Sequence, residues 1–400
     1  MLEKGNNMRY RNILFLVETP ILTRYIDRYG IRELREQGFF VTIIDLSPYL
    51  LPITYKSIRS DLCDYEKEGF IRIFNLKAYQ QYLDKFRSEN TLVICSMGYR
   101  WEYRKVFREL KSRGIHFCYF MQEMSNTDAT KEKKSIIKRL SISNLKSFVT
   151  RRIPLKYQNI PYADFIIGCG GEKNALDSYK KARLCTDQTP VYFFHSSNYE
   201  ECLINNNPNR FNYKYAVFVD QFLPFHTDNL DAGIKIEPSI YYERLNAFFD
   251  YVEDRYNLKI VVAAHPRSNY EDYDDCFKGR AVIKNDTCTL IKYSEFVIYH
   301  FSNSLGYLAI YKKPVIVIST EEVYYHFGES IDSVCDCLGV KRVDIDHISE
   351  VDSINLDECI KNIPSIYEEY IRNYMKKEYT GKLEGERLWV QIGKFIKGMS

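Results

Sequence analysis

Short apolar runs alternate with amphipathic stretches along nearly the whole chain, and this alternation limits the possible folds more than any other feature. In the first half the apolar runs cover residues 12–17, 39–47, 71–76, 91–96, 116–121, 163–171 and 191–194. In the second half they cover residues 215–222, 259–266, 280–284, 294–302 and 314–320. Intervening segments such as 103–114 and 172–182 have apolar residues at helical spacing. Strand–helix alternation of this kind predicts an α/β fold in which helices cover both faces of parallel sheets.

The chain is long enough for two such domains, because a single core seldom grows beyond about 300 residues. The alternation stops over residues 195–213, which are interrupted by Asn, Ser and Pro. We therefore predict a doubly wound domain over residues 1–194, a hinge over 195–213 and a second doubly wound domain over 214–353. Residues 354–400 show helical patterns without further strands, which predicts a helical C-terminus.

Charge and hydropathy exclude several classes of partner. The chain has 56 Lys and Arg residues against 53 Asp and Glu residues, which is too balanced for a surface that binds nucleic acid. No apolar run approaches the ~18 residues of a membrane-spanning helix, and the first one, Ile13 to Val17, is short for a secretory signal. The 11 cysteines form no CxxC pair, which favours reduced thiols. We expect a cytoplasmic protein that binds no nucleic acid.

Residues 131–156 depart from this charge balance. They contain nine Lys or Arg residues and a single acid, Glu132. Ile137, Leu140, Leu145 and Phe148 can share one face of a helix here, which would let the segment rest on anionic lipid headgroups. A solvated helix or loop inserted between sheet elements explains the same pattern. Peripheral attachment to the inner face of the plasma membrane is therefore one of two interpretations.

Two predicted strands in the second half end in polar turns. One turn is His265-Pro266-Arg267, and the other is Ser302-Asn303-Ser304, which opens a helical pattern. Ligands of open α/β sheets bind outside the carboxyl ends of the strands. Serine hydroxyls and the free N–H groups of a helix start suit a phosphate, and a histidine from a nearby strand end can hydrogen-bond the same anion. The proline would direct the imidazole toward the ligand by fixing the turn.

Each turn also has a plainer explanation. A single histidine at a strand end is commonly a surface or capping residue, and Ser-x-Ser before a helix is commonly an N-cap. Both turns occur in the same predicted domain, however, and a strand with the sequence KKPVIVIS follows the second one. The combination therefore favours a phosphate site.

Residues 255–320, with the His-Pro turn, the strand–Ser-x-Ser–helix block and the KKP segment, resemble two bacterial GT-B groups that use cytidine nucleotides. These are the CMP-sialic acid and related CMP-nonulosonate transferases, and the CDP-glycerol glycerophosphotransferases of teichoic acid synthesis. The resemblance implies two Rossmann-like domains facing a cleft, with His265, Ser302 and Ser304 contacting the donor phosphate. The chain departs from both groups in having Ser-Asn-Ser instead of paired serines, and His300 where an acid is common.

An inverting transferase also needs a general base for the acceptor hydroxyl. The sequence offers three acids that follow predicted strands, Glu18, Glu123 and Asp220. Asp220 and Glu18 lead because each follows the first strand of its domain, and Gln221 and His226 lie just beyond Asp220. Any of the three acids could instead cap the loop that follows its strand.

Together these features predict a metal-independent glycosyltransferase without a cofactor. The DxD matches at 272–274 and 344–346 do not follow a strand that points at the expected site. The enzyme would transfer a sugar, most simply a nonulosonic acid from a CMP-sugar, to a free or lipid-linked glycan in capsule or lipopolysaccharide synthesis. Donor contacts are expected from His265, Pro266, Arg267, Ser302, Asn303, Ser304 and Gln221. Open alternatives are transfer of glycerol phosphate, use of a UDP- or GDP-sugar, and a non-catalytic nucleotide-binding scaffold in polysaccharide assembly.

Overall fold

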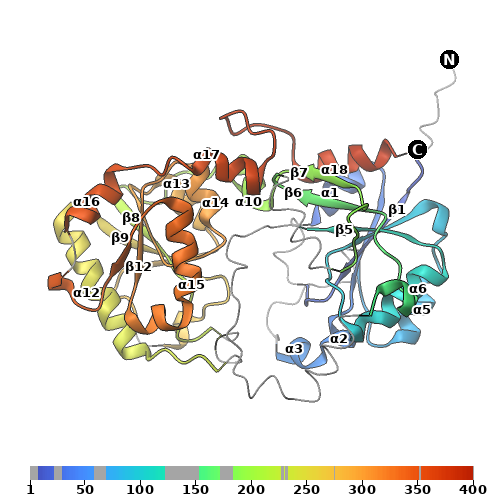
Figure 1. Ribbon diagram of the computed structural model, residues 1–400, viewed down its shortest axis with the longest axis horizontal. Coiled ribbons are helices and arrows are strands. Elements are labelled where there is room, and N and C mark those ends of the chain that lie inside the picture. Colours follow the sequence, from blue (N-terminus) through green and yellow to red (C-terminus); the bar gives the residue numbers. More distant parts are fainter. Residues whose placement is uncertain are drawn as a thin grey trace. The chain divides into compact units, whose positions relative to one another are not determined.

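The computed structural model describes residues 8–21, 29–57, 69–121, 153–171, 183–226, 229, 233–273, 275–350 and 353–399. The described chain forms two compact units (Figure 1). The first unit holds the described residues up to Ser197 together with those from Glu384 onward. The second unit holds the described residues from Asn198 to Leu383. The predicted C-terminal helices are thus divided between the two units.

The first unit is built on a seven-stranded parallel sheet with the order β3-β2-β1-β4-β5-β6-β7. Its strands are β1 (Asn12–Val17), β2 (Phe40–Asp45), β3 (Phe70–Arg72), β4 (Thr91–Cys95), β5 (His116–Phe120), β6 (Phe165–Cys169) and β7 (Val191–Phe194). The helices among them include α1 (Ile31–Glu36), α2 (Ser47–Leu50), α3 (Pro52–Ser57), α5 (Leu76–Leu83) and α6 (Arg104–Ser112). The strand order reverses direction between β1 and β4, so the loops after these two strands flank the reversal.

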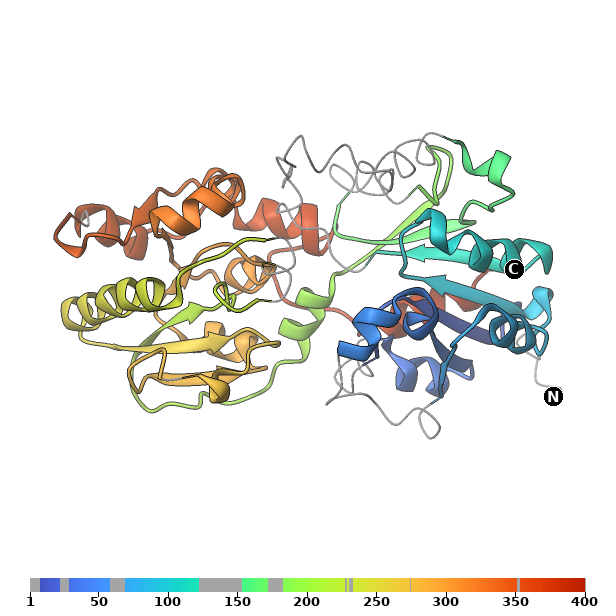
Figure 2. The same ribbon diagram turned by 90° about the horizontal axis from the view of Figure 1, so that it is seen from below.

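The second unit repeats this plan with six parallel strands in the order β10-β9-β8-β11-β12-β13. They are β8 (Tyr215–Val219), β9 (Lys259–Ala264), β10 (Ala281–Lys284), β11 (Val297–Tyr299), β12 (Val315–Ser319) and β13 (Arg342–Asp344). Its helices include α10 (Ser197–Ile204), α12 (Pro238–Tyr256), α13 (Thr287–Tyr293), α14 (Leu305–Ile310), α15 (Glu321–Leu338), α16 (Ser353–Lys361) and α17 (Tyr367–Tyr370). The long helix α12 lies alongside the strands of this sheet (Figure 2).

Every apolar run in the sequence overlaps a strand, and the predicted pair of parallel α/β sheets is confirmed. The inner strands β4 and β8 are buried at every position, as the unbroken apolar character of their sequences requires. The prediction missed β13, because only Val343 of its three residues is apolar. So short a run gives no periodic signal.

The last helix, α18 (Leu388–Lys397), belongs to the first unit, where it lies beside α1 and β7 (Figure 1). Trp389 is 3% exposed, and its ring packs against Phe15 and Phe120 with centroids 5.2 and 5.1 Å apart. Phe395 packs against Tyr192, with ring centroids 4.4 Å apart. The final residues of the chain therefore complete the core that the first strands begin.

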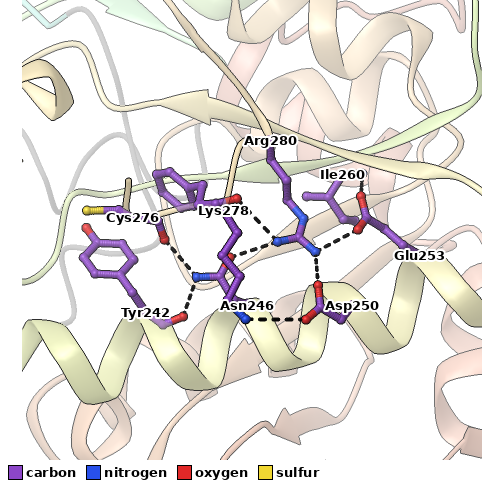
Figure 3. Close-up of polar contacts among 9 residues, drawn as sticks. Tyr242, Asn246, Asp250, Glu253, Ile260, Cys276, Lys278 and Arg280 are labelled. Carbon is purple, nitrogen blue, oxygen red and sulfur yellow. Dashed lines mark hydrogen bonds and ion pairs between the residues drawn. The ribbon is translucent and has the colours of Figure 1, made fainter. Parts of the chain in front are cut away.

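A polar network joins α12 to the start of β9 and β10 (Figure 3). The Arg280 guanidinium donates to Asn246 Oδ1 at 2.9 Å and to Glu253 Oε2 at 2.7 Å, and it also pairs with Asp250. The other Glu253 oxygen accepts from the backbone N–H of Ile260 at 2.8 Å. Because Ile260 lies within β9, this network helps to fix the strand that leads to His265.

Two predictions from the sequence concern membranes, one about membrane-spanning helices and one about contact with lipid headgroups. Among the helices of the described ranges, none combines the length and apolar character needed to cross a bilayer. Residues 131–152 of the basic segment 131–156 lie outside the described residues. Its contact with lipid stays a prediction.

Candidate functional site

The sequence-predicted residues of the second unit gather where its strand order reverses. Strand β8 lies between β9 and β11, with Val219 opposite Ala263 and Phe218 opposite Ile298. The loops after these three parallel strands therefore leave the same edge of the sheet side by side. Ligands of open α/β sheets bind in the crevice at such a reversal. The loops begin with Asp220, His265 and His300, and Ser302 follows two residues after His300.

Asp220 anchors two of these loops. Its side chain is 3% exposed, and it accepts from Phe222 N at 2.9 Å, His265 N at 3.2 Å and the Tyr270 hydroxyl at 2.9 Å. Burial raises the pKa of Asp220, and the hydrogen bonds from Phe222, Tyr270 and His265 partly oppose that rise. Both carboxylate oxygens thus serve groups of the chain itself. This geometry favours a positioning role, and the role of general base stays a prediction.

His265 occupies a tight turn, as its neighbouring proline led us to expect. The N–H of Ser268 donates to the His265 carbonyl at 2.9 Å, which closes the turn around Pro266. Nδ1 of the ring accepts from the N–H of Arg267 at 3.2 Å. An imidazole that accepts at Nδ1 carries its proton on Nε2, so this ring presents a donor there. The side chain is half-buried, whereas Pro266 and Arg267 are exposed.

The Ser-Asn-Ser turn brings two hydroxyl groups together. Ser302 Oγ accepts a hydrogen bond from the backbone N–H of Ser304 at 3.2 Å. Its hydroxyl also donates to Ser304 Oγ at 3.3 Å. Ser304 stands at the start of α14, but its side chain makes no capping hydrogen bond. Asn303 is exposed, and its carbonyl accepts from the side chain of Asn198 at 2.7 Å. The plain N-cap explanation therefore does not describe Ser304.

Gln221, the residue after Asp220, has a buried polar atom without a partner. Its Oε1 has no hydrogen bond within the described part of the chain. A buried acceptor left unpaired costs about 1–3 kcal/mol, so such atoms are uncommon unless water or a ligand satisfies them. Gln221 can therefore offer an acceptor to a ligand at this edge of the sheet.

His300, which stands where the resembling families often have an acid, faces the core of the unit. It is fully buried, with Nδ1 2.7 Å from the Ile318 carbonyl and Nε2 2.9 Å from the Tyr241 hydroxyl. These partners fit a neutral ring that donates from Nδ1 and accepts at Nε2. Burial lowers the pKa of His300 from 6.5 to about 4, although the hydrogen bond to Ile318 works in the opposite direction.

This buried histidine predicts a pH-dependent stability. Below pH 6.5 the unfolded imidazole binds a proton that the native ring excludes until about pH 4. The stability that His300 contributes is therefore complete above pH 6.5 and declines as the pH falls toward 4, by about 3 kcal/mol. Urea unfolding at pH 7 and pH 4.5 measures this decline, which should be clearly smaller in His300→Gln. The exposed His347→Gln should behave as the wild type. Equal declines in wild type and His300→Gln would contradict the assignment.

The first unit has its own acid at a reversal of strand order. Glu18 follows β1 by one residue, and its Oε2 is buried without a hydrogen-bond partner in the described residues. Burial raises the pKa of Tyr103, and the nearby Glu18 carboxylate raises it further, although no hydrogen bond of ordinary geometry joins the two groups. Glu123, the third predicted base, lies outside the described residues. Of the two described acids, Glu18 is the one with an unused oxygen.

Sequence reasoning missed the aromatic residues that hold the loops after β8 and β9 together. Rings of the first loop contact rings of the second in four pairs. These are Phe222 with Tyr270 at 5.1 Å and with Tyr273 at 6.0 Å, Phe225 with Tyr273 at 3.9 Å, and His226 with His265 at 4.9 Å between centroids. The only sequence signal was the high density of aromatic residues near both strand ends, which does not specify pairs.

Metal ligation has no visible basis in the described ranges, since no group of three or more His, Cys, Asp or Glu side chains there is placed to hold an ion. The hydroxyl, imidazole and amide groups near β8, β9 and β11 suit an anion better than a cation. Metal-independent transfer stays a prediction.

Comparison with known proteins supports the architecture. The sequence matches no protein-family model and no curated protein. Among solved structures, a variant of the wall teichoic acid polymerase TagF is similar with a TM-score of 0.56 and 11% identity, over 96% of this chain and 88% of that one. The same polymerase soaked with CDPG gives a TM-score of 0.55 at 10% identity, over 98% and 89%. CalG4, the calicheamicin glycosyltransferase, gives 0.51 at 10% identity, over 98% and 99%. The chain therefore has the GT-B fold, as predicted from its sequence.

Proposed function

We propose that this protein is a transferase of bacterial surface polysaccharide synthesis that moves a group from a cytidine-nucleotide donor to a glycan hydroxyl. One observation carries the proposal. The His-Pro turn after β9 and the Ser-x-Ser turn after β11 flank β8 at the reversal of strand order, where open α/β sheets bind ligands. The similarity to a teichoic acid polymerase and to a glycosyltransferase gives independent support.

In this proposal the second unit binds the donor. The hydroxyls of Ser302 and Ser304 and the Nε2–H of His265 donate to the nucleotide phosphate. Arg267 adds positive charge, Asn303 and Pro266 shape the turns, and Gln221 accepts from a donor hydroxyl. Fixed donors aimed at a phosphate stabilise the charge that develops on it as its bond to the transferred group breaks.

The acceptor hydroxyl must lose a proton during transfer, and we propose Glu18 as the base that accepts it. Its buried Oε2 supports this choice, because this oxygen accepts no hydrogen bond within the described residues and so has room for the proton of an acceptor hydroxyl. Asp220, whose oxygens are occupied, would position the donor loops. Glu123 is the remaining candidate. Attachment to the inner membrane surface through 131–156 would bring the enzyme to a lipid-linked acceptor.

Two transferred groups are compatible with a cytidine donor. The sequence motifs favour a nonulosonic acid from a CMP-sugar. The similarity to the teichoic acid polymerase, including the structure soaked with CDPG, favours glycerol phosphate as the second candidate. The proposed contacts of the serine and histidine turns are with the phosphate and not with the base. The nucleotide panel described next can therefore also identify a UDP- or GDP-sugar as the donor.

Thermal unfolding with a panel of CMP, CDP, UDP and GDP tests the donor. A ligand at 100 times its dissociation constant adds about 2.7 kcal/mol to the stability of the protein that binds it. We expect CMP or CDP to raise Tm, His265→Gln to abolish the rise, and the exposed His347→Gln to retain it. A response to uridine or guanosine nucleotides alone would discard the cytidine donor. No response to any nucleotide would overturn the proposal.

Turnover then separates an enzyme from a scaffold. CMP release from a CMP-nonulosonate, or from CDP-glycerol, is measured with and without a glycan acceptor. An enzyme should lose about 10²-fold or more of this rate in Glu18→Gln, with nucleotide binding unchanged. Nucleotide binding without turnover of either donor would favour the non-catalytic scaffold.

A further inference from the structure

We propose that His226 and His265 form a two-imidazole site that binds the leaving phosphate of the nucleotide as a dianion. This inference rests on the proposed function and specifies the chemical state that its phosphate site recognises. The two rings lie 4.9 Å apart between centroids, with their planes at 72°. Both side chains are half-buried at the carboxyl edge of the second sheet.

The two loops that carry these rings are held as one body. His226 ends the described part of the loop after β8, and His265 begins the loop after β9. Asp220 accepts hydrogen bonds from both loops, since Phe222 belongs to the first and His265 and Tyr270 to the second. The buried carboxylate of Asp220 therefore joins the two loops that carry the imidazoles.

The backbone of the first loop is strained in a way that fits a binding site. Phe222 has a φ of 55°, in the left-handed region that bulky residues rarely adopt. Strain of this kind costs of order 1–3 kcal/mol and is concentrated at functional sites. In this loop the strained turn places the ring of Phe222 against the ring of Tyr270, with centroids 5.1 Å apart. The same loop then continues to His226.

The negative charge on the nucleotide phosphate increases during the proposed reaction, so positive charge in its binding site stabilises the product more than the reactant. In a CMP-sugar or CDP-glycerol the phosphate beside the breaking bond is a diester-type monoanion. When its bond to the transferred group breaks, the bonding electron pair stays on the phosphate oxygen and the leaving CMP carries a dianion. The acceptor oxygen forms the new bond, and its proton passes to the base. One imidazole donor suits the monoanion, and a second, protonated imidazole suits the dianion.

Other charged groups near the pair do not cancel this preference. Asp220 accepts a hydrogen bond from the backbone of His265, and two further donors of the two loops also occupy its oxygens. Tyr270 donates to that carboxylate and stays neutral because burial raises its pKa. Arg267 is exposed on the His265 turn and adds positive charge, whereas Glu271 and Asp272 on the same loop are exposed to solvent.

The test measures CMP and cytidine binding by titration calorimetry between pH 7 and 8.5, where CMP is already a dianion. We expect His226→Gln to weaken CMP binding about 10-fold or more and to leave cytidine binding within twofold. Wild-type protein should take up more protons on binding CMP than His226→Gln, in paired buffers of different ionisation enthalpy. His226→Gln and His265→Gln should be less than additive in the double variant if one phosphate contacts both rings. His347→Gln, on the exposed surface of the same unit, is the control.

The outcomes separate this inference from the proposed function. Loss of CMP binding in His265→Gln with no change in His226→Gln would overturn the inference and leave the function intact. If the wild type binds no cytidine nucleotide, the function falls, and UMP and GMP become the probes. The inference then survives only if His226→Gln weakens the binding of whichever nucleoside monophosphate, UMP or GMP, the wild type binds. His226→Asn, checked by thermal unfolding, guards against a folding defect in the first variant.

Discussion

Replacement of Trp389 by alanine is expected to lower the free energy of unfolding of the first unit by about 3–5 kcal/mol, the usual cost of removing a buried indole. The ring packs between Phe15 of β1 and Phe120 of β5, so its loss leaves a cavity between the sheet and α18. Gly30 allows this packing, because it has a φ of 54° and a Cβ at this position would lie 1.9 Å from Trp389 Cγ. Any residue larger than glycine at position 30 would clash with the indole of Trp389 on α18.

Calorimetric unfolding measures this effect, and the other tryptophan of the chain provides the matched control. Trp101 is half-buried beneath the Arg104 guanidinium, 4.6 Å from the ring centroid, so Trp101→Ala should cost no more than about 1 kcal/mol. A double variant with Gly30→Ala extends the test. The steric part of the Gly30→Ala penalty should disappear in the Trp389→Ala background, while the strain of the positive φ remains. Equal costs for the two tryptophan variants would contradict the packing described for α18.

Asp220→Ala is expected to have the largest effect on the candidate site. It leaves the N–H groups of Phe222 and His265 and the Tyr270 hydroxyl without their acceptor. Unpaired buried donors cost about 1–3 kcal/mol each. The loops after β8 and β9 would separate, and displacement of His265 should reduce donor turnover by ~10²-fold or more, as small misplacements of binding groups do. Donor turnover and chemical unfolding together measure both consequences.

Asp220→Asn distinguishes a positioning residue from a general base. The amide keeps one acceptor oxygen, so a positioning role predicts partial loss of donor affinity and an unchanged acid limb in the pH–rate profile. A general base predicts intact donor affinity, a rate lower by about 10²–10⁴-fold and loss of the acid limb. The second pattern would return Asp220 to the role first considered for it and remove the need for Glu18.

The local parts of the fold were predictable, because they depend on signals within a few residues. Apolar runs such as 91–96 and 215–222 identified buried strands, and the residues that end strands were visible as the His-Pro and Ser-x-Ser turns. The short strand β13 was not predictable, since Arg342, Val343 and Asp344 carry no periodic pattern. The burial of His300 was not predictable either, because its position at a strand end does not reveal that its hydrogen bonds to Ile318 and Tyr241 lie in the core.

The amino-acid sequence by itself thus determined which segments become strands and which chemical groups stand at their ends. Only the tertiary structure decided which of those ends meet. Strand order places β8 between β9 and β11, and this pairing is what allows Asp220 to hold His265, 45 residues away, and α18 to complete the core around β1. Such contacts depend on pairing and packing between segments far apart in the chain, and no local periodicity encodes them.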